Sequence, residues 1–169
     1  MLPHQSHYRL ADDVISHLDT VMSSLSDPWI STRYTGFLSV TAVTVFELAI
    51  KDIFREFARK KHPVFGKYAD SQFNRINGRI KNNNLKNDYI KAFGEKYLKR
   101  YNKKIDKIEN DALRNEGISV KAAYANLINW RNDFAHEGVI PSTATYQEVV
   151  KSYELGKRVI DCVEETMRR

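Results

Sequence analysis

The chain of 169 residues has one cysteine, four prolines and seven glycines, and these low counts exclude several classes of protein. The single Cys162 cannot form an internal disulfide, and no Cys/His pairs occur at the spacing of a zinc site. The longest uncharged stretch, residues 34–46, is 13 residues long and carries several Thr and Ser, so it is too short and too polar to span a bilayer. We expect a cytoplasmic protein with no membrane association, metal or cofactor.

The composition is that of an ordinary globular domain, with 42% hydrophobic and 28% charged residues. The length allows one domain with a substantial core and is short for two, so residues 1–169 are interpreted as a single domain. A net charge of +6 favours a polyanionic partner such as RNA. A surplus of surface lysines would give the same charge, so charge alone does not decide the partner.

Apolar residues recur at steps of three and four through most of the chain, which predicts helices. Asp27-Pro28, His62-Pro63, Gly117, Gly138 and Pro141 interrupt this pattern, and Asn82–Asn84 are typical of a turn. A shorter helix is expected around Phe73, Ile76 and Ile80. The sequence therefore predicts an all-α bundle of about five main helices, over residues 7–25, 32–61, 87–115, 119–138 and 145–167.

A strongly basic segment runs from Arg75 to Lys107, with eleven Lys or Arg against three acidic residues. Its local charge of +8 exceeds that of the whole chain, which makes it a candidate track for an RNA backbone. A solvated helix face is the alternative. The candidate RNA-binding residues are Lys96, Lys99, Arg100, Lys103 and Lys104. Aromatic residues recur every four positions along the same helix, a spacing typical of a core stripe, although such rings can also stack on bases.

The segment Arg131–His136 places a permanent cation and a titratable imidazole on a helix whose other residues form an apolar stripe. A helix turns by about 100° per residue, so Arg131 and His136 diverge by about 140° and lie about 7.5 Å apart along the axis. A buried guanidinium needs a partner, and Glu47, which has apolar helical neighbours, is the candidate. We expect Arg131 and Glu47 to meet across two helices. The alternative is a purely structural ion pair, with His136 favoured at a helix C-terminus by the dipole.

The segment Arg131-Asn132-Asp133-Phe134-Ala135-His136 resembles the R-x-x-x-x-H signature of the HEPN superfamily, with Asn132 as the polar residue after the arginine. The upstream Phe46-Glu47-Leu48 resembles the acidic helix of the RiboL-PSP-HEPN and MAE-type branch. Length and helical pattern extend the resemblance over most of the chain. In HEPN toxins controlled by nucleotidyl transfer, a tyrosine follows two residues after the histidine. This chain has Gly138 there, which argues against that form of regulation.

The resemblance implies a homodimer in which two such motifs face one cleft, and a metal-independent endoribonuclease. In that interpretation His136 exchanges protons, Arg131 holds the phosphate, and Asn132 positions either the phosphate or His136. Glu47 and Asp133 are supporting residues. The products would carry 2′,3′-cyclic phosphate ends. Such proteins act as toxins or phage-defence effectors, with an antitoxin or another defence protein as a partner. The alternative is a catalytically inactive HEPN module that dimerises and binds RNA or nucleotides.

Overall fold

The computed structural model describes residues 3–74 and 76–168, and these residues form helices and connecting segments without a β-strand. The predicted all-α class is confirmed. In chain order the elements are η1 (Pro3–His7), α1 (Tyr8–Met22), α2 (Pro28–Lys61), α3 (Pro63–Phe73), α4 (Asn82–Asn84), η2 (Leu85–Ile90), η3 (Lys91–Phe93), α5 (Glu95–Glu116), α6 (Val120–Glu137) and α7 (Tyr146–Met167).

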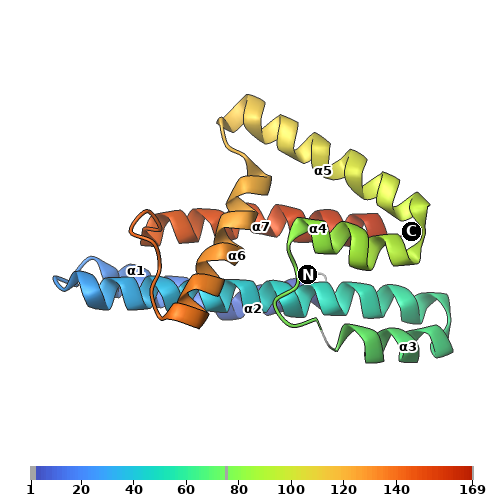
Figure 1. Ribbon diagram of the computed structural model, residues 1–169, viewed down its shortest axis with the longest axis horizontal. Helices are drawn as coiled ribbons and strands as arrows, with labels where there is room; N and C mark the ends of the chain where they lie inside the picture. Colours follow the sequence, from blue (N-terminus) through green and yellow to red (C-terminus); the bar gives the residue numbers. More distant parts are fainter. Residues whose placement is uncertain (1–2, 75, 169) are drawn as a thin grey trace.

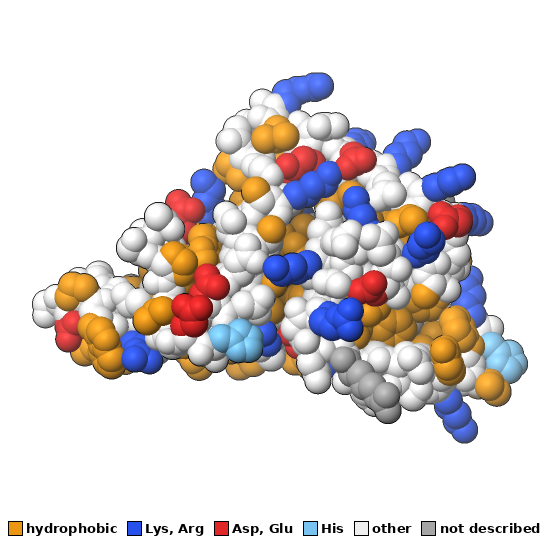
Figure 2. Space-filling view, in the orientation of Figure 1, with side chains coloured by type: hydrophobic (Ala, Val, Ile, Leu, Met, Phe, Trp, Pro, Cys, Tyr) orange, Lys and Arg blue, Asp and Glu red, His pale blue; other side chains and the backbone are white. Residues whose placement is uncertain are grey.

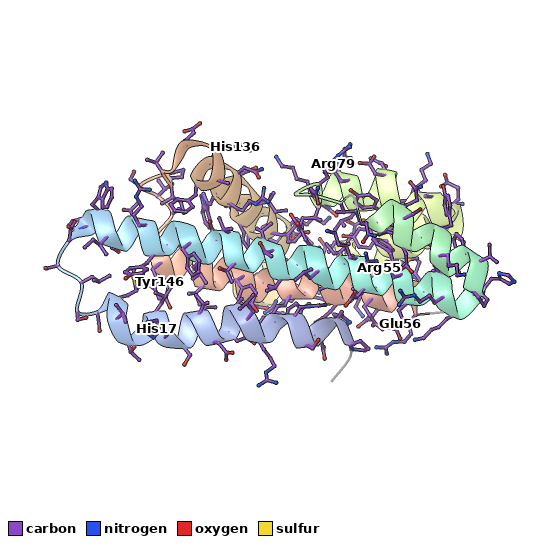
Figure 3. The ribbon with its side chains drawn as sticks, turned by 90° about the horizontal axis from the view of Figure 1, so that it is seen from below. His17, Arg55, Glu56, Arg79, His136 and Tyr146 are labelled. Carbon is purple, nitrogen blue, oxygen red and sulfur yellow. The ribbon has the colours of Figure 1, made fainter. Side chains whose placement is uncertain are left out.

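The long helix α2 is the axis on which the other elements are arranged. Helices α1, α2 and α7 run along the long dimension of the molecule, α6 crosses them, and α5 slants over the end at which α6 begins (Figure 1). Helix α3 folds back beneath the last turns of α2. Seen from below, α2 lies between α1 on one side and α6 on the other (Figure 3). Among the described residues, no helix combines the length and apolar character needed to cross a bilayer.

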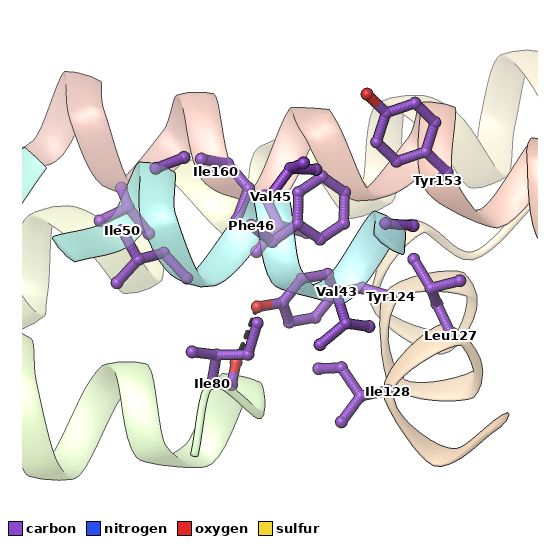
Figure 4. Close-up of a cluster of buried hydrophobic side chains, with 14 of the residues drawn as sticks. Val43, Val45, Phe46, Ile50, Ile80, Tyr124, Leu127, Ile128, Tyr153 and Ile160 are labelled. Carbon is purple, nitrogen blue, oxygen red and sulfur yellow. Dashed lines mark hydrogen bonds between the residues drawn. The ribbon is translucent and has the colours of Figure 1, made fainter. Parts of the chain in front are cut away.

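Tightly packed rings join α2, α6 and α7 at the centre of the molecule. The ring of Phe46 stacks on Tyr153 at a centroid distance of 5.5 Å and lies 5.9 Å from Tyr124 (Figure 4). A Cβ at Gly156 would come within 2.6 Å of the Phe46 ring, so this glycine allows α7 to approach α2 closely. The buried hydroxyl of Tyr124 donates to the carbonyl oxygen of Ile80 at 2.7 Å. This bond attaches the connection between α3 and α4 to α6.

Several helix ends differ from the expected positions. Asp27-Pro28 separate the first two helices as expected, but they also start α2, which was expected from residue 32: the Asp27 carboxylate accepts from the amide of Trp29, and Pro28 takes the first helical position. The helix expected over 87–115 is interrupted at Gly94, whose φ of 120° is incompatible with helical backbone. Asn82–Asn84, expected as a turn, form a helical turn that leads into a π-helix.

The helix count also differs from the expected five, because six helices of at least 11 residues occur in the described part of the chain. The additional one is α3, for which Phe65, Ala69 and Phe73 give only a short apolar pattern. Of the residues expected in a short helix here, only Phe73 is helical. Ile76 and Ile80 are buried in the irregular connection that follows.

We predict that Tyr124→Phe lowers the free energy of unfolding by about 1–3 kcal/mol, because it leaves the buried carbonyl of Ile80 without a donor. Urea denaturation measures this change. Tyr34→Phe removes an exposed hydroxyl and serves as the control, with a change below about 0.5 kcal/mol. Equal stability of the two variants would show that the Tyr124–Ile80 bond does not fix this connection.

Candidate functional site

The ends of α6 are defined by specific caps, which fix the position of its last two turns. Ser119 accepts the amide of Ala122 at 3.0 Å, and at the other end Gly138 adopts a left-handed φ of 70°. Between them Phe134 lies against Gly36 of α2, where any Cβ would collide with the ring. Glycine at position 36 therefore lets the C-terminal part of α6 rest directly on α2.

Three segments converge on the carboxylate of Glu47. Its Oε1 accepts the backbone amide of Gly78 at 2.7 Å and lies 3.6 Å from Nη2 of Arg131. The expected ion pair between Arg131 and Glu47 is therefore present. Glu47 belongs to α2, Arg131 to α6 and Gly78 to the connection between α3 and α4, so one carboxylate links three parts of the chain.

Gly78 was not identified from the sequence as a site residue. Its φ of 72° lies in the left-handed region, and a Cβ there would come within 3.0 Å of Nη1 of Arg131. Any other residue would thus be strained and would also press on the guanidinium. The dipeptide Asn77-Gly78 is a typical turn signal and could have identified the position.

Burial controls the protonation of Glu47. Its side chain is 12% exposed, and desolvation raises its pKa above the ordinary value of 4.5. The Gly78 amide and then the Arg131 guanidinium act in the opposite direction and lower the pKa, without fully cancelling the effect of burial. The carboxyl is therefore held in an environment that penalises its charge, and Arg131 is one of the groups that keep it ionised.

The guanidinium of Arg131 is only partly satisfied by protein groups. Its side chain is 24% exposed, Nη1 donates to Oδ1 of Asn132 at 3.0 Å, and the 3.6 Å separation from Glu47 is longer than a hydrogen bond. Nε also lacks a hydrogen-bond partner among the described residues, but it is buried from solvent. The donor capacity that Arg131 retains for an anion therefore lies at Nη2, which makes no hydrogen bond to these residues, while Asn132 contacts the guanidinium rather than His136.

His136 has different surroundings from Arg131. It lies in the last turn of α6, is exposed, and makes no hydrogen bond or ion pair with the described part of the chain. Figure 3 places it on the side of α2 opposite α1. Asp133 is half-buried and also has no partner among these residues. The helix thus presents a held arginine and a free histidine, with no contact between them.

The expected RNA-binding residues on α5 divide into two groups. Arg100 donates to the carbonyl of Thr166 at 3.0 Å, and Lys104 pairs with Glu165 at 2.6 Å, so both attach α5 to α7. Lys96, Lys99 and Lys103 are exposed and have no carboxylate partner in the described residues, and cationic side chains project from α5 in Figure 2. Arg75 lies outside the described residues. These cations lie in the N-terminal half of α5, and the contacts of Arg100 and Lys104 place it beside the end of α7.

The aromatic stripe of the same region belongs to the core. Tyr101 is fully buried, and Tyr89, Phe93 and Tyr97 pack against the core while part of each ring remains accessible. Within the described residues, no group of three or more His, Cys, Asp or Glu side chains is arranged to hold a metal ion.

The sequence profile of the RiboL-PSP-HEPN family matches residues 6–168, almost the whole length described above. The chain belongs to the RiboL-PSP-HEPN family. Neither a curated protein nor a solved structure gives a significant match. Family membership supports a HEPN module related to nucleotides or RNA. As in the sequence comparison, the position two residues after the histidine is Gly138, and its left-handed φ makes a tyrosine there strained in this fold.

We predict that Arg131→Ala raises the pKa of Glu47 further, because Arg131 is one of the groups that lower it. Because the pKa of Glu47 is higher in the folded than in the unfolded protein, the free energy of unfolding falls as the pH rises from about the unfolded pKa through the folded one. The larger rise in Arg131→Ala should make this fall above pH 4.5 larger in the variant than in the wild type. A ¹³C NMR titration of the Glu47 carboxyl measures the shift.

Lys51→Met is the matched control for this titration. Lys51 also lowers the pKa of Glu47, but by less than Arg131, so its removal should give a smaller rise. An unchanged or lower Glu47 pKa in Arg131→Ala would contradict the electrostatic coupling inferred from the 3.6 Å ion pair.

Proposed function

We propose that this HEPN protein is a metal-independent endoribonuclease whose active site is completed by a second copy of the chain. The observation that carries this is the asymmetry of α6, where Arg131 is held with an unused donor at Nη2 and His136 is exposed without a partner in the described part of the chain. A purely structural arginine needs no free histidine one turn further along. A single protomer offers the two groups in different directions, and a facing copy supplies the missing half.

The chemistry uses the nucleophile that RNA itself carries. The 2′-oxygen attacks the adjacent phosphorus, the bond from phosphorus to the 5′-oxygen breaks, and a 2′,3′-cyclic phosphate and a 5′-hydroxyl result. An imidazole can both accept and release a proton, so His136 can take the proton of the 2′-hydroxyl or return one to the leaving oxygen. Arg131 stabilises the charge that builds on the phosphate, and Asn132 orients the guanidinium.

An exposed apolar face beside the end of α6 supports the dimer. Ile30, Tyr34, Phe37 and Leu48 lie along one side of α2 and remain at least a third exposed. Phe37 and Tyr34 follow and precede Gly36, on which Phe134 of α6 rests. Figure 3 views the molecule from below and shows α2 between α1 and α6. Two copies that bury these faces against each other would bring their α6 ends together.

The second candidate is a catalytically inactive HEPN module that dimerises and binds RNA. The contacts of Glu47 with Arg131 and Gly78 favour this candidate, because they link three segments of the chain and would stabilise the fold of an inactive protein as well. Cleavage of RNA distinguishes the two candidates.

For the active form, we propose that the protein is a cytoplasmic toxin or phage-defence effector, controlled by an antitoxin or another defence protein.

We predict that the purified protein cleaves mixed RNA in excess EDTA and leaves DNA intact, because DNA lacks the attacking 2′-hydroxyl. His136→Ala should lower the rate by about 10²-fold or more, and Arg131→Ala by a similar factor. Gel analysis of end-labelled RNA measures both. The control is His62→Asn, which changes an exposed histidine that caps α3 into another capping residue. Cleavage that survives both α6 substitutions, or that EDTA abolishes, would refute the mechanism.

For the dimer, we predict that Phe37→Asp gives a monomer in light scattering, because it places a charge in the proposed apolar face. Phe37 is 51% exposed, so the substitution should leave the fold intact. Leu113→Asp on α5, where the side chain is 47% exposed, is the matched control and should remain dimeric. A wild-type mass that is monomeric at every concentration would refute the composite site.

A further inference from the structure

A second site is formed by aromatic side chains between α3 and the irregular helical segment 85–93. A cavity of about 280 Å³ is lined by Phe65, Tyr68, Gln72, Phe73, Asp88, Tyr89 and Phe93, among others. Phe73 and Phe93 stack almost in parallel at its base, with centroids 5.9 Å apart. Tyr68 stands at the rim with 60% of its surface exposed. Part of the wall is the π-helix Leu85–Ile90, a rare form of helix that is frequent at functional sites.

Polar groups without partners are also present in this cavity. Oδ2 of Asp88 accepts from Asn84 at 2.8 Å, but its Oδ1 has no partner among the described residues. The amide of Gln72 is likewise free of hydrogen bonds to the described part of the chain. A carboxylate repels phosphate and accepts from N–H groups, and an amide can donate or accept. This combination suits the edge of a flat heterocycle whose faces are covered by rings.

One cation lies beside the cavity, next to the lining residue Asp88. Nη2 of Arg79 is 3.7 Å from the partly exposed Asp88 carboxylate, and the Arg79 side chain is 72% exposed. Ligands that combine a flat base with a phosphate backbone match this arrangement, because the base can enter the cavity while a phosphate contacts the exposed Arg79.

The cavity is connected directly to the Arg131 site. The hydroxyl of Tyr89 donates to the carbonyl oxygen of Arg79 at 2.9 Å, and the preceding residue, Gly78, is the one that contacts Arg131 and Glu47. The aromatic wall and the guanidinium therefore lie on two sides of the same short connection. Figure 3 shows Arg79 and His136 on the same side of α2.

We propose that this cavity binds one unpaired nucleobase of an RNA strand whose phosphates run from Arg79 towards Arg131. The inference rests on RNA being the ligand of the Arg131 site and adds a base-recognition pocket to it. A base held here would set which phosphate reaches Arg131, and the enzyme would then favour single-stranded RNA, because a base inside a duplex cannot enter the cavity.

The test uses a short single-stranded oligonucleotide with 2′-fluoro groups in place of every 2′-hydroxyl, which cannot undergo the proposed cleavage. Fluorescence anisotropy measures its affinity for the full chain. Tyr68→Ala should weaken binding about tenfold, the effect expected for the loss of one stacked base, while Tyr68→Phe should bind like the wild type. Trp29→Ala, which removes a 65% exposed aromatic at the other end of α2, is the control and should change nothing.

An abasic oligomer of the same length distinguishes base recognition from backbone binding. Its weaker binding should be equal for wild type and Tyr68→Ala. Equal affinities of wild type and Tyr68→Ala for the base-containing strand would overturn the proposal, as would a tenfold loss that the abasic oligomer shares. Because this probe is not cleaved, the result is independent of catalysis: a protein that binds it through Tyr68 but does not cut RNA retains the base pocket and loses only the nuclease mechanism.

Discussion

The contact of Glu47 with Arg131 and Gly78 is the interaction on which the arrangement of the site depends. Charged groups that leave water need compensating partners, and this carboxylate finds them in a backbone amide at 2.7 Å and a guanidinium at 3.6 Å. Each partner comes from a different segment, so α6 and the connection after α3 are both attached to α2 at one point. Its raised pKa indicates that the environment is costly for charge, which makes loss of either partner consequential.

The rest of the site is built outward from this contact. Caps at Ser119 and Gly138 set the length of α6, and Gly36 lets its last turns approach α2. The Tyr124–Ile80 bond holds the other end of the connection that carries Gly78 and Arg79. As a result, the exposed His136 and Arg79 lie on the side of α2 away from α1, and the residue before Arg79 contacts Arg131. The proposed RNA strand would pass along these groups.

The two basic regions have different physical roles. On α5 some cations are used internally, since Arg100 and Lys104 bind the end of α7, and the exposed lysines lie away from Arg131. Near the cavity, by contrast, Arg79 adjoins both Asp88 and the residue that contacts Arg131. Positive charge is therefore concentrated on α5, whereas Arg79 is the cation adjacent to the residue that contacts Arg131, which is why the path proposed for an RNA strand follows Arg79.

The sequence by itself determined the all-α class, the Arg131–Glu47 pair and the HEPN motif, because periodicity and the need to pair a buried charge are local or pairwise constraints. Only the tertiary structure decided that α3 is a separate helix, that Gly94 interrupts the next one, and that Gly78 lies beneath Arg131. It also decided that the aromatic residues of segments 65–73 and 89–93 enclose a cavity. Such features depend on contacts between residues far apart in the chain, and neither spacing nor propensity encodes which distant surfaces will meet.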